Sequence, residues 1–258
     1  MTQEKKNKDK NKDNTQEKDK EMGVMEHLGE LRKRILYSAG FILVFFLVSW
    51  TFVNKIYYWL SLPVLKFLPE GEKLAFTSLT EPFMMYIKLS FISGIFLASP
   101  FVFYHVFAFI KPGLKEKEEH MVYPFVFFST FFFVAGGAFG YFFVFPLACR
   151  FFLEIGKDFQ AIIKISEYFS LAFRVLIGIA VIFELPVLAY LLSRLGILTS
   201  SFLVKYFKYA IVVIFIIAAV ITPTPDVVTQ SMFVVPMLLL YLLSILIAKM
   251  AGPKKDKE

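Results

Sequence analysis

Long apolar runs separated by short polar segments dominate the pattern of this chain. A helix needs about 20 apolar residues to cross a bilayer. The runs lie at Ile35–Val53, Pro82–Ile110, Val122–Ala148, Tyr168–Leu192, Tyr209–Ile221 and Val227–Ala248. Helical period and length together predict an all-α polytopic membrane protein, with six transmembrane helices within residues 24–250.

The fifth run is unusually short. As a helix it rises about 20 Å, whereas the hydrocarbon core of a bilayer is about 30 Å thick. It meets the sixth run through the tight turn Thr222-Pro-Thr-Pro-Asp226. Either this hairpin is buried in the bundle, or the bilayer thins beside it. We favour thinning, with Lys205 and Lys208 extending their charged ends to the interface.

The distribution of basic residues predicts the orientation. The two terminal segments and the second and fourth loops hold 20 Lys and Arg, against 6 in the first, third and fifth loops. Because basic residues concentrate in cytoplasmic loops, we expect both termini in the cytoplasm of a bacterial-type cell, with the chain in its inner membrane.

Composition separates the membrane domain from its ends. Residues 1–23 are charged and almost free of apolar side chains, so we expect a disordered cytoplasmic tail there, and a short cytoplasmic C-tail over residues 251–258.

The hydrophobic fraction of 57% is too high for one soluble core. The net charge of +7 is spread over separate loops, which argues against nucleic-acid binding.

Prolines and glycines indicate how the helices pack. Interior prolines remove backbone hydrogen bonds and bend helices. They occur at Pro100, Pro124, Pro146, Pro186 and Pro236, and therefore favour a bent, concave bundle. Gly136, Gly137 and Gly140 give the third span a small face for close helix contact.

No motif for catalysis is found. There is no phosphate-binding loop, and His27, His105 and His120 have no Cys or carboxylate partner at metal-ligand spacing. We therefore expect neither an enzyme nor a bound cofactor or metal.

Charged residues within the spans are costly and therefore informative. Lys88 and Arg174 lie near the outer ends of their spans, where they can reach water. Glu184 is different, because it lies about 13 Å from Ser193 and about 24 Å from Tyr168 along the helix. It is protonated, faces a wet cavity, or meets a polar group of another helix or another protein.

Carboxylates also gather on the cytoplasmic side. Glu30 precedes the first span, and Glu116, Glu118 and Glu119 crowd the second loop near Phe109. Guanidinium binds a carboxylate through a bidentate fork that lysine cannot copy. The alternatives are a site for a cationic ligand, with Phe109 adding an apolar or cation–π surface, and an ordinary solvated loop.

At these residues the chain resembles the C subunit of the twin-arginine translocase (TatC), a family that exports folded proteins. The resemblance covers about Glu26 to Met250. Five ordered motifs carry it: His27-Leu-Gly-Glu-Leu-Arg-Lys-Arg34, Glu81-Pro-Phe83 with Ile87-Lys-Leu89, Phe107-Ala-Phe-Ile-Lys-Pro-Gly-Leu114, Phe183-Glu-Leu-Pro186, and Thr222-Pro-Thr-Pro-Asp226 with Gln230.

The resemblance implies a receptor and core subunit. Glu30, Phe109 and Glu118 would bind twin-arginine signal peptides, while Glu184, Asp226 and Gln230 would contact single-span partner subunits of the A and B types. Pro63 would be a structural residue of the external cap. Because Glu119 and His120 stand where the family usually has a basic residue after the loop glutamate, Glu116, Glu118 and Glu119 all remain candidates for the arginine contact.

Two other classes are disfavoured. A secondary transporter that uses Glu184 as its coupling group would need paired inverted repeats, and we find no halves that match. An intramembrane serine protease would need a nucleophile motif and a histidine at matching depth, and neither is found in the sequence.

Overall fold

The computed structural model describes residues 2–66, 74–110, 122–160, 162–222 and 226–252 of the chain, with side chains from His27 onward. Within these residues, five helical segments are long and apolar enough to span a membrane, and a sixth apolar helix is shorter. The predicted all-α architecture with six membrane helices is confirmed.

The helices follow the predicted runs closely. Their bounds are α1 Thr2–Thr51, α2 Val53–Leu65, α3 Glu81–Ile110, α4 Val122–Phe139, α5 Phe145–Ile155, α6 Ile165–Ile182, α7 Leu185–Arg194, α8 Ser200–Lys205, α9 Phe207–Ile221 and α10 Val227–Ala251. A π-helical segment, Gly140–Val144, joins α4 to α5. The third span is thus α4 to α5, the fourth is α6 and α7, and α2 and α8 are short connecting helices.

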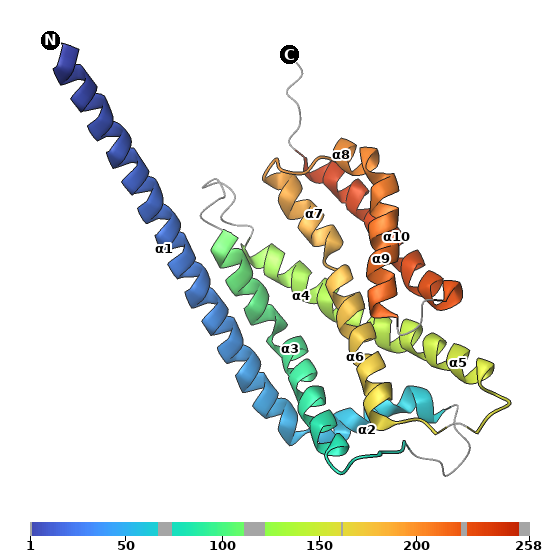
Figure 1. Cartoon of the computed structure of the whole chain (residues 1–258). Helices are drawn as coiled ribbons and strands as arrows, with labels where there is room; N and C mark the ends of the chain where they lie inside the picture. The colour runs from blue at the N-terminus through green and yellow to red at the C-terminus, as the bar shows by residue number, and fades with distance from the viewer. Residues whose placement is uncertain (1, 67–73, 111–121, 161, 223–225, 253–258) are drawn as a thin grey trace.

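The spans pack in a chain of neighbours (Figure 1). Helix α1 lies along α3, α3 packs on α4 and α6, and α10 packs on α7 and α9. The start of α1 and the end of α10 lie at the same end of the molecule, opposite α2. This agrees with an even number of spans and with the predicted placement of both termini on one side.

Helix α1 extends far beyond the bundle at its N-terminal end (Figure 1). Its backbone is helical from Thr2. The cytoplasmic tail expected over residues 1–23, and its disorder, stay predictions. The domain boundary near residue 23 stays a prediction.

Two of the five prolines expected to bend helices coincide with an interruption of a helix, whereas α3 and α10 continue through Pro100 and Pro236. The π-helical segment precedes Pro146, which lies in the first turn of α5. The fourth span is interrupted between Ile182 and Leu185, and Pro186 lies in the first turn of the helix that resumes. Since proline cannot donate the hydrogen bond of an interior helical residue, both sites loosen the helical ladder and the spans bend there.

Glycines allow helices to approach closely, as predicted for the third span. A Cβ added to Gly136 would lie 2.8 Å from Ala180 Cα, and one added to Gly137 would lie 2.4 Å from the Phe96 ring. Contacts this short are sterically forbidden. These two positions therefore set how closely α4 packs against α6 and α3.

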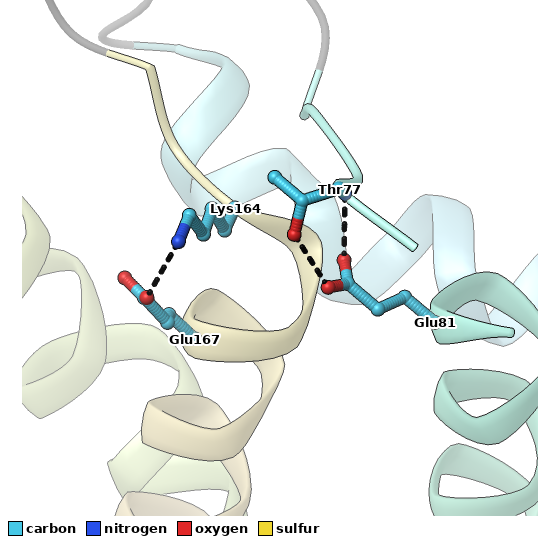
Figure 2. A network of polar contacts seen from close by, with 4 residues as sticks. All are labelled: Thr77, Glu81, Lys164 and Glu167. Carbon is cyan, nitrogen blue, oxygen red and sulfur yellow. Dashed lines mark hydrogen bonds and ion pairs between the residues drawn. The ribbon is translucent and has the colours of Figure 1, made fainter. Parts of the chain in front are cut away.

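Two loops join at the end opposite the termini. Ala75, in the first loop, forms an isolated parallel bridge with Lys164, in the third. Its backbone accepts from Ile165 N at 2.7 Å and donates to Ile163 O at 2.9 Å. Figure 2 shows that the Thr77 N–H and hydroxyl donate to the carboxylate of Glu81, the first residue of α3, while Lys164 pairs with Glu167 of α6. The cap therefore connects the outer ends of α3 and α6.

Candidate functional site

The start of the first span and the end of the second meet at the end of the molecule that carries the termini. The His27 ring of α1 stacks on the Phe109 ring of α3, with centroids 4.4 Å apart and planes 23° apart. Glu30 follows one turn after His27 and is half-buried. The segments that carry Glu30 and Phe109, two of the three residues predicted for the cytoplasmic site, therefore pack against each other through His27.

Glu30 already has a cationic partner. Arg34 Nη2 donates to Glu30 Oε1 at 3.1 Å, and the two side chains are 28% and 35% exposed, respectively. Because they are four residues apart on one helix, the pair orients the carboxylate along α1. A carboxylate can accept several hydrogen bonds at once, so Glu30 keeps capacity for a second donor.

A buried histidine lies beneath this pair. His105 of α3 is only 8% exposed, and its ring lies among Tyr37, Phe41 and Tyr104. Its Nδ1 is buried without a hydrogen-bond partner among the described residues. The rings of Tyr37 and Phe41 therefore pack α1 against His105 of α3.

Glu118, the third residue predicted for this site, lies outside the described residues, as do the alternatives Glu116 and Glu119. The loop that carries them begins directly after Ile110, one residue beyond Phe109. The contribution of this loop to the proposed site therefore rests on the sequence alone.

Glu184 lies at the break between α6 and α7, where it precedes the first turn of α7. The residue is 8% exposed and its Oε1 makes no hydrogen bond of normal geometry among the described residues. The Ser129 hydroxyl of α4 lies beside it and is also buried without such a bond. These two buried polar groups, on neighbouring helices, are therefore close enough to interact with each other.

Arg174 does not serve Glu184. It is exposed, and it belongs to the outer turns of α6 together with the exposed Glu167 one heptad earlier. Lys88 is exposed on α3 as well. Both positions agree with side chains that reach outward, and neither forms a salt bridge within the part of the chain that the structure describes.

The two polar residues at the α9–α10 turn have structural contacts. Asp226 caps α10: its Oδ1 accepts from Thr229 N at 2.7 Å, and its Oδ2 accepts from the Thr229 hydroxyl. Gln230 Nε2 donates to Phe215 O of α9 at 2.8 Å. Asp226 thus starts α10, and Gln230 ties α10 to α9.

Pro63 lies inside α2 and is buried. In the same helix, Leu60 O accepts a hydrogen bond from the Tyr168 hydroxyl at 2.8 Å, and Trp59 O accepts one from the Tyr141 hydroxyl. Helix α2 is therefore fastened to the third and fourth spans, while the structural role of Pro63 in an external cap stays a prediction.

Sequence reasoning missed Arg34 and Ser129. The pairing of Arg34 with Glu30 was readable from the four-residue spacing, whereas the approach of Ser129 to Glu184 depends on the register between two helices. Among the described residues, no cluster of three or more His, Cys, Asp or Glu side chains is arranged to hold a metal ion.

Comparison with known proteins gives one consistent family. The model of the family TatC, Sec-independent protein translocase protein, matches residues 26–236. A TatC protein of Koribacter versatilis is 41% identical over 95% of this chain and 91% of its own length. One from Helicobacter pylori strain 26695 is 44% identical over 90% of both chains.

Solved structures agree with the sequence matches. A crystal structure of the twin arginine translocase receptor TatC has a TM-score of 0.78 and 35% identity, covering 87% of this chain and 99% of the other. A second crystal structure of that receptor, in DDM, has a TM-score of 0.80 and 34% identity, covering 86% and 99%. The similarity therefore extends over nearly all of the membrane domain.

Proposed function

This chain belongs to the TatC family of Sec-independent protein translocase proteins, and we propose that it is the receptor and core subunit that binds twin-arginine signal peptides at the cytoplasmic face of the inner membrane. A translocase component of this kind works by binding and assembly, and it carries out no bond chemistry. Its cargo is folded protein that carries such a signal.

The observation that supports the proposal is the stacking of His27 on Phe109. This contact joins the segment of α1 that carries Glu30, one turn after His27, to the end of α3 that carries the Phe109 ring. An arginine side chain needs both, because its planar guanidinium forms a fork with carboxylate oxygens and stacks on aromatic faces. A lysine ammonium makes neither contact equally well.

The pair of arginines calls for more than one acceptor. Glu30 supplies one carboxylate, which Arg34 holds in place through a single oxygen. The loop after Ile110 supplies the candidates Glu116, Glu118 and Glu119. We assign the second arginine to Glu118, and the apolar part of the signal then inserts along the exposed side of the bundle.

Partner subunits would use the other polar sites. Glu184 and Ser129 form a buried polar pair, and neither Glu184 Oε1 nor the Ser129 hydroxyl makes a hydrogen bond of normal geometry among the described residues. Such bonds stabilise helix association in a membrane, where no water competes. We propose that a single-span subunit contacts Glu184 and the α9–α10 region around Asp226 and Gln230.

Peptide binding tests the receptor proposal. The full-length protein in nanodiscs is titrated with a twin-arginine signal peptide and with its twin-lysine variant, at two salt concentrations. Selective binding of the arginine form, lost in Glu118→Ala and retained in a Glu154→Gln control at the opposite end, supports the receptor. Equal binding of both peptides, abolished by salt in both cases, would leave only a generic acidic surface.

A further inference from the structure

A groove of about 880 Å³ lies between the outer half of the third span and the first turns of α10. Its side chains are apolar apart from Ser231 and Arg150. The wall from the third span includes Phe142 and Phe143, and the wall from α10 includes Val228 and Met232.

The groove is open and its apolar walls are not covered by protein. Phe142 and Phe143 are 65% and 64% exposed, and Val228 is 51% exposed. In a membrane these surfaces are covered either by lipid chains or by another protein. The charged side chain at the rim of the groove indicates which of these two occupants, lipid or protein, fits the groove.

Arg150 is the single charged side chain of this groove. It is exposed on α5 and forms no salt bridge among the described residues. Counted from Val122, it lies about 42 Å along the third span, farther than the hydrocarbon thickness of about 30 Å. Even in a tilted helix this places Arg150 near the phosphate level, while Phe142 and Phe143 lie deeper.

We propose that the groove binds one anionic phospholipid of the leaflet on the capped side, with its phosphate at Arg150 and an acyl chain along Phe143 and Met232. A guanidinium at the rim and an apolar wall below it match the two parts of an amphiphile, since Arg binds phosphate oxygens through paired hydrogen bonds. A purely apolar partner helix would fill the groove but leave this cation without an anion. The inference does not depend on signal-peptide binding.

The test uses the full-length protein in detergent, depleted of lipid and titrated with phosphatidylglycerol, with bound lipid counted by native mass spectrometry. Arg150→Gln should bind about tenfold more weakly, as the loss of a charged hydrogen bond implies. Lys157→Gln, which removes a nearby exposed cation outside the groove, should bind like the unmodified protein.

A second pair of variants tests the apolar wall. Val228→Trp fills the groove and should also reduce lipid binding, whereas Val220→Trp, on an exposed position of α9 outside the groove, should not. Equal binding by Arg150→Gln and Lys157→Gln would overturn the proposal. So would a Val228→Cys protein that, in the assembled complex, cross-links to a single-span subunit and retains no lipid.

Discussion

The ring of His27, at the start of the first span, stacks on Phe109, at the end of the second. This contact joins two segments that are distant in sequence and places the His27 segment of α1 beside the end of α3. The proposed arginine site therefore depends on the packing of these two helices as well as on its carboxylates.

Replacing Phe109 by Ala should weaken binding of a twin-arginine peptide about threefold to tenfold, because an aromatic contact of this kind contributes about 0.5–1.5 kcal/mol. Phe109→Tyr keeps the ring and should bind normally. Phe128→Ala, on an exposed position of α4, is the matched control. Titration in nanodiscs measures the effect, and normal affinity in Phe109→Ala would exclude the ring from the site.

Glu30→Gln should lower the affinity for the same peptide about tenfold, because an amide replaces a charged acceptor. The salt dependence of binding should also fall, since one ionic contact is lost. Isothermal titration at two salt concentrations measures both quantities. Unchanged affinity and salt dependence would move the whole arginine contact to the second loop, outside the described residues.

Glu184→Ala should impair assembly with single-span subunits more than Glu184→Gln does, because the amide can still form hydrogen bonds at this depth. Native gel electrophoresis of the co-expressed complex measures this difference. Ser129→Ala should show a smaller defect of the same kind. If all three variants assemble normally, Glu184 and Ser129 have a packing role only.

Gly136→Ala should lower the free energy of unfolding by about 1–3 kcal/mol, the usual cost of overpacking. The added methyl would meet the backbone of Ala180, which cannot rotate away as a side chain can. Gly40→Ala is the control, because nothing lies within 4 Å of the added Cβ there. Thermal unfolding in detergent compares the two, and similar melting temperatures would contradict a close α4–α6 contact.

The membrane helices were predictable because lipid imposes a simple length and composition on each one. The run Pro82–Ile110 differs from α3 by one residue at its start. The bends near Pro146 and Pro186 were also expected, since proline acts locally. The sequence does not determine the register between neighbouring helices. The position of Ser129 beside Glu184 was therefore not predicted.

The candidate site was predictable in part. Glu30 and Phe109 were selected from residue type, sidedness and family resemblance, and the structure brings their segments together through His27. The spacing of Asp226 and Thr229 is that of a helix N-cap and its partner, so this capping role of Asp226 could be predicted from the sequence. The sequence analysis instead predicted a contact between Asp226 and a partner subunit.

The bridge between Ala75 and Lys164 has a consequence for how the protein is made. Ala75 and Lys164 are separated in the chain by the second and third spans. The bridge therefore cannot form until both spans have been inserted into the membrane. Closure of this bridge then fixes the start of the fourth span at Ile165. A defect in either loop would therefore leave the second and third spans inserted but α3 and α6 without this connection between their ends.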